Sequence, residues 1–251
     1  MSSFAESYDR YRPRPPQALL DLLTRLADVE RPALVVDLGT GTGLSARARA
    51  GRAERVVGIE PDDAMLEVAE ARGGGIEYVA ASASATGLPD ACADIVTCSQ
   101  SLHWMEPEPT FAEVGRILRP GGIFAAYDYD PIPVVHPELD AAYEAVMEAA
   151  REARERTGRI SPWTTSRPLW KAEHLQRLRD SGRFRFTREL VMHSVEEGDA
   201  DRFVGGARSM GAIEVHKDEL GLEELGALAR RVLADRVVPF WFGYRVRIGL
   251  R

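Results

Sequence analysis

The segment Leu34-Val35-Val36-Asp37-Leu38-Gly39-Thr40-Gly41-Thr42-Gly43 decides the fold. It begins with a short apolar run and ends in glycines, a pattern typical of a strand buried on both faces of a parallel sheet. Glycine lets the backbone turn sharply and lets a ligand approach the main chain. A helix that follows such a turn presents unpaired N–H groups and the positive end of its dipole. The segment therefore predicts a strand, a ligand-binding turn and a helix.

Similar apolar runs recur on the C-terminal side of this segment, with helical patterns between them. They lie at residues 56–59, 76–79, 95–98 and 123–126. Strands that alternate with helices imply right-handed crossovers and a doubly wound α/β sheet. Five strands are predicted before residue 128.

The spacing within the turn narrows the choice of ligand. Dehydrogenases more often show Gly-x-Gly-x-x-Gly, whereas here the spacing is Gly-x-Gly-x-Gly, and no Gly-Lys-Ser/Thr follows as in a P-loop. Asp37, two positions before the first glycine, is a poor neighbour for pyrophosphate but suits a cationic ligand. Glu60 ends the second strand, about one βαβ unit later, where a carboxylate can accept from two ribose hydroxyls.

Several motifs in a fixed order resemble those of class I S-adenosylmethionine-dependent methyltransferases. They are residues 35–43, Gly58-Ile59-Glu60-Pro61, 84–89, Ser101-Leu102-His103-Trp104 and Leu118-Arg119-Pro120-Gly121-Gly122. Together with Tyr8-Asp9-Arg10-Tyr11-Arg12-Pro13, they are similar to the small-molecule subgroup that contains trans-aconitate and ubiquinone/menaquinone-type methyltransferases. The resemblance covers residues 4 to about 130. It implies a seven-stranded, mostly parallel sheet with an antiparallel last strand, and S-adenosylmethionine as cofactor.

The resemblance also implies a set of cofactor-binding residues. Glu60 would take the ribose hydroxyls, Met65 would pack on adenine, and Arg12 is a candidate partner for the cofactor's carboxylate. Ser84 stands where many relatives carry an aspartate, which puts that hydrogen bond in question. The full set is Tyr8, Arg12, Asp37, Gly39, Thr40, Gly41, Gly43, Glu60, Pro61, Met65, Ser84, Ala85, Ser99 and Gln100.

His103 is the candidate catalytic base, because it follows the fourth strand and an imidazole accepts a proton at neutral pH. The alternative is that His103 and Trp104 form a structural pair. Methyl transfer needs mainly alignment and a dry pocket, so no triad or metal is required. The predicted substrate-binding residues are His103, Trp104, Tyr127, Trp163, Trp170 and Met210; large aromatic residues are more often part of a core.

The second half of the chain has a different pattern. Prolines after residue 130 break the chain, and a long amphipathic helix is predicted over about 138–156. We therefore expect a cofactor-binding core at 1–130, with an N-terminal cover helix at 1–30. A helical cap over the active site is predicted at 131–183. Residues 184–251 would complete the sheet.

Composition restricts the remaining choices. The 251 residues are 45% hydrophobic and 28% charged, with a net charge of −7, which argues against nucleic acid as the main partner. Two cysteines and five histidines without metal-ligand spacing predict no metal site. No apolar run is long enough for a membrane span and no secretory signal is evident, so a cytoplasmic enzyme with a small-molecule methyl acceptor is expected. The alternatives are an NAD(P)-dependent oxidoreductase and a cofactor-binding protein without transfer activity.

Overall fold

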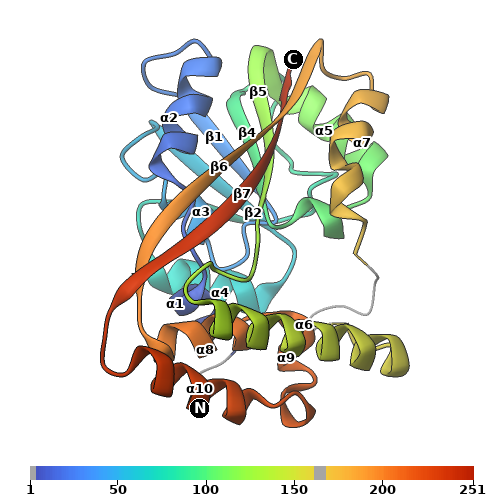
Figure 1. Ribbon diagram of the computed structural model, residues 1–251. Helices are drawn as coiled ribbons and strands as arrows, with labels where there is room; N and C mark the ends of the chain where they lie inside the picture. Colours follow the sequence, from blue (N-terminus) through green and yellow to red (C-terminus); the bar gives the residue numbers. More distant parts are fainter. Residues whose placement is uncertain (1–3, 161–167) are drawn as a thin grey trace. The chain divides into compact units, whose positions relative to one another are not determined.

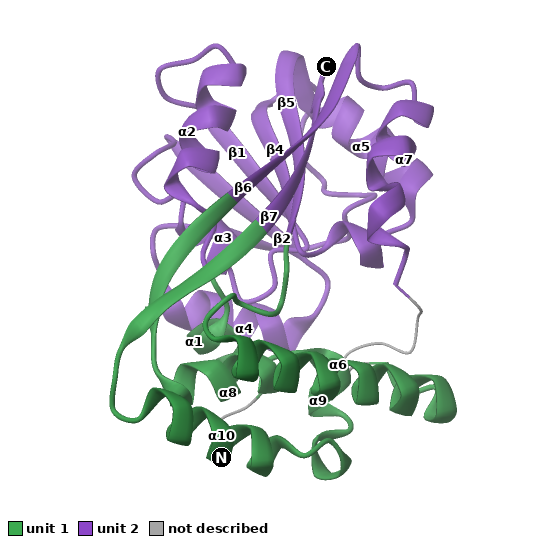
Figure 2. Cartoon of the chain, viewed as in Figure 1, with its two compact units in different colours: residues 1–13, 129–167, 193–243 green, residues 14–128, 168–192, 244–251 purple. Residues whose placement is uncertain are grey.

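The computed structural model describes residues 4–160 and 168–251. The chain forms two compact units, shown in different colours in Figure 2. Unit 1 comprises residues 1–13, 129–167 and 193–243, and unit 2 comprises 14–128, 168–192 and 244–251. Trp163 lies outside the described residues. The division into core, cap and closing strands at residues 130 and 183 stays a prediction.

Seven strands form one sheet in the order β3-β2-β1-β4-β5-β7-β6. Their bounds are β1 Leu34–Leu38, β2 Arg55–Glu60, β3 Glu77–Ala80, β4 Ala93–Ser99, β5 Leu118–Tyr129, β6 Phe186–Gly198 and β7 Val238–Leu250. The pairs β1–β2, β1–β4, β2–β3 and β4–β5 are parallel. β7 runs antiparallel to β5, as the exchange of backbone hydrogen bonds between Arg251 and residues 121–122 shows. The predicted fold class is confirmed.

β1, β2, β4 and β5 are mostly buried because helices cover an apolar sheet, whereas no residue of β3 is fully buried. All five residues of β1 are buried, as a strand in the middle of a parallel sheet should be. Figure 1 shows β1, β2, β4 and β5 side by side. The helical elements of this unit are α2 Gln17–Leu26, α3 Leu44–Arg47, α4 Asp63–Arg72, η1 Leu102–Trp104, α5 Pro107–Ile117, η2 Lys171–Glu173 and α7 His174–Asp180.

Parallel pairing places the functional segments at one edge of the sheet. Val35 and Val36 of β1 pair with Ile95 and Val96 of β4, and Leu38 pairs with Ile59 of β2. The glycine turn after β1, Glu60 at the end of β2, and the chain that leaves β4 therefore meet at the carboxyl ends of the strands. Open α/β sheets bind ligands at this edge, where the strand order reverses.

Unit 1 is mainly helical. Its helices are α1 Phe4–Tyr11, α6 Pro137–Thr157, α8 Ala200–Arg208, α9 Gly211–Glu214, η3 Lys217–Glu219 and α10 Leu222–Leu233. α10 packs against both α6 and α8. α6 begins with Pro137 at its first turn and ends at Gly158, whose φ of +70° stops the helix. Its buried stripe includes Leu139, Tyr143 and Val146.

Candidate functional site

The glycine turn is fixed by backbone conformation and by close packing. Gly39, Gly41 and Gly43 have φ values of +62°, +57° and +78°, which disfavour other residues. A Cβ atom at Gly39 would lie 2.7 Å from Cβ of Ser101, and one at Gly43 would lie 2.2 Å from the Tyr78 hydroxyl. A Cβ at Gly41 would meet nothing within 4 Å. The turn is thus packed on both sides of Gly41 and open at Gly41 itself.

Asp37 holds this turn from beneath. Its side chain is buried and accepts hydrogen bonds from the hydroxyls of Thr40 at 2.8 Å, Thr97 at 2.7 Å and Ser45 at 3.4 Å. Burial raises the pKa of Asp37, while the three hydroxyl donors favour its charged form. A buried carboxylate with these partners ties the turn to β4 and α3.

Tyr127 belongs to the same network. Its hydroxyl lies 2.6 Å from the Ser45 hydroxyl, and its ring is 1% exposed. Burial raises the pKa of Tyr127, so the phenol stays protonated at neutral pH. The structure places this side chain beneath the turn, beside Asp37. Its predicted role in a substrate wall stays a prediction.

Glu60 connects the end of β2 to the open part of the turn. One carboxylate oxygen accepts from the backbone N–H of Gly41 at 2.8 Å and the other from that of Asp62 at 3.1 Å. Burial raises the pKa of Glu60, and these two backbone donors oppose the rise. Each carboxylate oxygen has a second lone-pair direction, so both can accept from a further donor such as a ribose hydroxyl.

The segment after Glu60 is held by a helix cap. The carboxylate of Asp62 accepts from the backbone N–H of Met65 at 3.0 Å and caps α4. Met65 is half-buried and Pro61 is exposed. The cap orders the start of α4, so that the apolar Met65 lies in the first turn of the helix that follows Glu60.

The turn after β3 contains Ser84 and Ala85. Both residues are exposed, and the Ser84 hydroxyl lies 3.1 Å from that of Ser82. The Ala85 N–H donates to the Ser82 carbonyl at 3.2 Å. The turn thus presents small polar side chains where the family pattern often has a carboxylate.

The chain leaves β4 in a strained conformation. Gln100 has a φ of +54°, which costs a non-glycine residue about 1–3 kcal/mol and is found mostly at functional sites. Its N–H donates to the Tyr127 carbonyl at 3.0 Å, and its side-chain carbonyl accepts from the ammonium of Lys171. Ser99, just before it, is half-buried.

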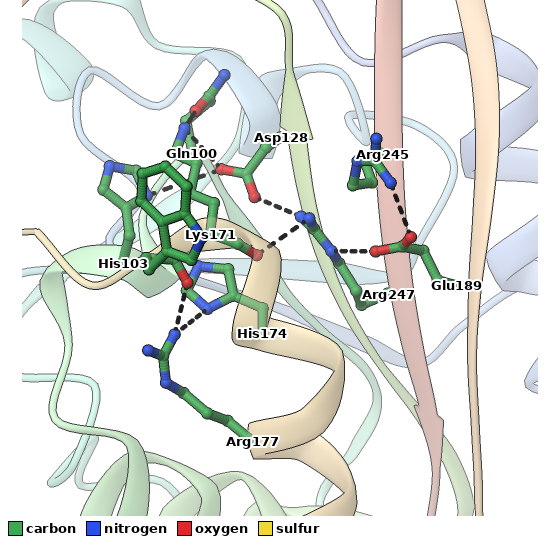
Figure 3. Close-up of polar contacts among 10 residues, drawn as sticks. Gln100, His103, Asp128, Lys171, His174, Arg177, Glu189, Arg245 and Arg247 are labelled. Carbon is green, nitrogen blue, oxygen red and sulfur yellow. Dashed lines mark hydrogen bonds and ion pairs between the residues drawn. The ribbon is translucent and has the colours of Figure 1, made fainter.

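Asp128 is the centre of a second polar cluster, drawn in Figure 3. Its carboxylate lies 2.7 Å from Nη1 of Arg247, 3.0 Å from Nζ of Lys171 and 3.7 Å from Nδ1 of His103. Burial alone would raise the pKa of Asp128, but Lys171, His103 and Arg247 together hold it below its usual value. Asp128 is therefore ionised at neutral pH.

His103 is buried within η1, with its Nδ1 turned toward Asp128. At 3.7 Å the contact is too long for a hydrogen bond but short for a charge interaction. An anion at this distance stabilises the positive charge that the ring carries after accepting a proton. The Trp104 ring packs against the imidazole, with 4.9 Å between ring centroids. Both predicted functions of His103, base and structural partner of Trp104, agree with this arrangement.

Sequence reasoning missed Arg247 and Glu189. Arg247, on β7, is 1% exposed, and its Nε donates to Glu189 of β6 at 2.8 Å. Its Nη2 donates to the Lys171 carbonyl at 3.1 Å. The last strand carries two arginines, Arg245 and Arg247, and the sequence alone does not show that Arg247 is the buried one. A buried arginine requires a carboxylate partner, but the sequence does not say which one.

His174 was also missed as a member of this cluster. It is fully buried, and Nη1 of Arg177 lies 3.1 Å from its Nδ1. Burial lowers the pKa of His174 to about 4, so the ring is neutral at pH 7. Its ring stacks on His103, with 6.5 Å between centroids.

The remaining predicted residues lie elsewhere. Trp170 is 70% exposed in unit 2. Tyr8, Arg12 and Met210 belong to unit 1. The predicted roles of Tyr8 and Arg12 in cofactor binding, and of Met210 in substrate binding, stay predictions. Within the described residues, no group of three His, Cys, Asp or Glu side chains could hold a metal ion. In the same part of the chain, every helix is too short or too polar to cross a membrane.

Known proteins resemble this chain in sequence and in fold. Residues 36–126 match the family model described as methyltransferase domain. An uncharacterized methyltransferase of Mycobacterium tuberculosis is 36% identical over 117 residues, which are 46% of this chain and 46% of that protein. A demethylmenaquinone methyltransferase of Clavibacter sepedonicus is 34% identical over 118 residues, or 45% of this chain and 48% of that protein. The chain thus matches about half the length of these curated relatives.

A solved structure extends the likeness to nearly the whole chain. A candidate type II methyltransferase from Anaeromyxobacter dehalogenans has a TM-score of 0.67 and 26% identity, covering 96% of this chain and 98% of that one. The sheet order, the glycine turn with its two carboxylates and the matched domain agree with one another. Residues 36–126 therefore form a methyltransferase domain, and the chain has the fold of the class I S-adenosylmethionine-dependent methyltransferases.

Proposed function

We propose that this protein transfers a methyl group from S-adenosylmethionine to a small organic acceptor. The observation that carries the proposal is the carboxylate of Glu60, which lies against the N–H of Gly41 at the open part of the turn. At this point the backbone of Gly41, which no side chain covers, lies next to the hydrogen-bond-accepting carboxylate of Glu60. A ribose with its two hydroxyls fits there, since a carboxylate accepts such bonds strongly.

The residues of unit 2 fit the rest of this cofactor. Gly39 and Gly43 keep the turn close to the sheet, and Asp37 braces it. Met65 offers an apolar surface for adenine. Because the side chains of Ser84 and Ala85 are small, the backbone groups of these residues would contact the edge of the adenine ring. The bound cofactor would supply a methyl group already activated on a sulfonium.

His103 and Asp128 would handle the acceptor's proton. Methyl transfer from the cofactor would leave the acceptor's nucleophilic atom with a proton to lose. The proton of the nucleophile passes to His103, and the ionised carboxylate of Asp128 stabilises the resulting imidazolium. The hydrogen bond from Lys171 to Gln100 would hold the segment between β4 and His103 in place, next to Asp128.

Binding measurements test the cofactor assignment. Isothermal titration of the purified protein should show affinity for S-adenosylhomocysteine and none for NAD or NADP. Binding of NAD with no response to S-adenosylhomocysteine would instead favour an oxidoreductase on the same type of sheet. Transfer of labelled methyl groups to a metabolite library should then identify an acceptor, whereas cofactor binding without any transfer would indicate a regulatory protein.

The role of His103 is tested with that acceptor. Replacement His103→Gln should lower kcat by about 10²-fold or more and leave S-adenosylhomocysteine affinity within about twofold, since general base catalysis contributes on this scale. Raising the pH should restore part of the rate when the acceptor's own proton dissociates. Near-normal turnover of the variant would leave His103 with a structural role only.

A further inference from the structure

Unit 1 contains a narrow aromatic pocket. Its walls include Tyr11, Tyr129, Tyr143, Phe203 and Phe240, and Arg12 lines it as well. The space that these residues line, including its part open to solvent, is about 320 Å³. A guanidinium beside aromatic walls suits a ligand that carries a small polar group on an apolar body.

Arg12 brings an uncompensated positive charge to this pocket. Its guanidinium donates to the Tyr129 hydroxyl and, at 2.7 Å, to the Ser209 carbonyl, and it stacks 4.5 Å above the Tyr8 ring. All these partners are neutral. Within residues 4–160 and 168–251, no carboxylate forms an ion pair with Arg12. Arg12 is half-buried, and a charge that is partly removed from water is stabilised by an anionic partner.

The pocket also has hydrogen-bond donors without acceptors. In the described part of the chain, Nε of Arg12, Nε of Arg202 and the hydroxyl of Tyr143 are buried and have no partner. Burial raises the pKa of Tyr143, so its hydroxyl remains a donor. Arg202 is already neutralised by Glu196. The lining thus offers three donors and one net positive charge.

We propose that this pocket binds a small aromatic or apolar carboxylic acid. Its carboxylate would supply acceptor oxygens and a single negative charge, which matches the one guanidinium without an ion pair. Asp130, which follows Tyr129 of the pocket wall, is exposed and accepts from the Ile132 N–H.

Two simple probes test the pocket. Benzoate and its neutral analogue benzamide are titrated into the full-length protein, with and without saturating S-adenosylhomocysteine, and binding is followed by ligand-detected NMR. Benzoate should bind at least about tenfold more tightly than benzamide, because only the anion pairs with Arg12. Equal binding of the two, tighter binding of inorganic phosphate, or no binding of benzoate overturns the proposal.

Three variants locate the site. Arg12→Met removes the charge, and Tyr143→Phe removes the hydroxyl while keeping the ring. Gly206→Val adds bulk at a lining position of α8 where a Cβ meets nothing within 4 Å. Each should weaken benzoate binding by about tenfold or more in a protein with unchanged circular dichroism. Arg208→Gln, on the same helix and exposed, is the control and should bind like the wild type.

A further comparison separates a free carboxylic acid from the cofactor as the source of the carboxylate. S-adenosylhomocysteine carries a carboxylate and 5′-methylthioadenosine does not. Arg12→Met should leave the affinity ratio of these two ligands unchanged. A selective loss of S-adenosylhomocysteine affinity would assign Arg12 to the cofactor and overturn the proposal. If the wild type binds benzoate but neither nucleoside, the proposed function fails while the pocket stands.

Discussion

At the scale of single residues, Asp37 and Glu60 show two uses of a buried carboxylate. Asp37 accepts hydrogen bonds from the hydroxyls of Thr40, Ser45 and Thr97 and stabilises the turn. Glu60 accepts only one backbone N–H on each oxygen and so retains capacity for a ligand. The sequence shows an acid at both positions, but only the hydrogen bonds distinguish the structural role of Asp37 from the ligand-binding role proposed for Glu60.

This difference predicts the effect of Glu60→Gln. An amide has one acceptor oxygen, so it cannot satisfy both backbone donors and two ribose hydroxyls. S-adenosylhomocysteine affinity should fall by about tenfold or more, as measured by isothermal titration. Glu70→Gln, an exposed acid on α4, is the matched control. Equal affinity of the Glu60 variant and the control would contradict the ribose assignment.

His174 predicts a pH dependence of stability. Its pKa is lowered by burial to about 4, against about 6.5 in an unfolded chain. As pH falls below 6.5 the unfolded chain takes up this proton before the folded protein does, so the free energy of unfolding decreases with falling pH. At pH 5 this loss is about 2 kcal/mol relative to pH 8.

Urea unfolding at pH 8 and pH 5 checks this value. His174→Gln keeps a side-chain acceptor for Arg177 but does not titrate. The variant should therefore lose about 2 kcal/mol less than the wild type between the two pH values. The same loss in both proteins would show that His174 is not the group responsible.

At the scale of elements, the sequence patterns predicted where most of the strands lie along the chain. Short apolar runs marked β1, β2 and β4 because buried parallel strands have few alternative patterns, and the run of β1 ends at a glycine. The helix predicted over 138–156 occurs as α6 Pro137–Thr157. The turn was recognisable because its backbone needs positive φ angles, which favour glycine at these positions in the sequence.

The glycine turn predicts two different outcomes from one substitution. Gly43→Ala places a Cβ 2.2 Å from the Tyr78 hydroxyl and should lower the free energy of unfolding, with loss of cofactor binding as a consequence. Gly41→Ala meets no protein atom and should cost only about 1–2 kcal/mol for its positive φ. Its methyl group, however, enters the open part of the turn.

Thermal unfolding and isothermal titration separate the two variants. Gly41→Ala should fold normally and bind S-adenosylhomocysteine about tenfold or more weakly, whereas Gly43→Ala should show a clearly lower Tm. If Gly41→Ala binds like the wild type, the ligand does not touch the backbone at this point.

At the scale of the whole chain, the cluster around Asp128 could not be predicted. Its members come from β5, η1, η2, α7, β6 and β7, and the contact between Asp128 and Arg247 joins positions 119 residues apart. Local periodicity carries no information about such pairs. The sequence shows two arginines in the last strand, but which of them is buried, and against which carboxylates, follows only from the order of strands in the sheet.

Two arginines of β7 allow this cluster to be tested. Arg245 and Arg247 both bind Glu189, but the side chain of Arg245 is 57% exposed and that of Arg247 only 2%. Exposed ion pairs contribute about 0–1 kcal/mol, whereas removing one partner of a buried pair costs about 3–5 kcal/mol. Without Arg247, the buried Asp128 would keep Lys171, whose side chain is 38% exposed, as its ion-pair partner. Arg247→Met should therefore lower the free energy of unfolding by several times more than Arg245→Met.

Urea unfolding of the two variants measures this difference, and the double variant Arg247→Met/Asp128→Leu shows its origin. If the cost lies in the orphaned carboxylate, replacing Asp128 by a side chain without charge should recover part of the stability lost in Arg247→Met. Losses that simply add would locate the effect in packing around Arg247. Equal losses in Arg245→Met and Arg247→Met would show that burial of the guanidinium does not govern the strength of this cluster.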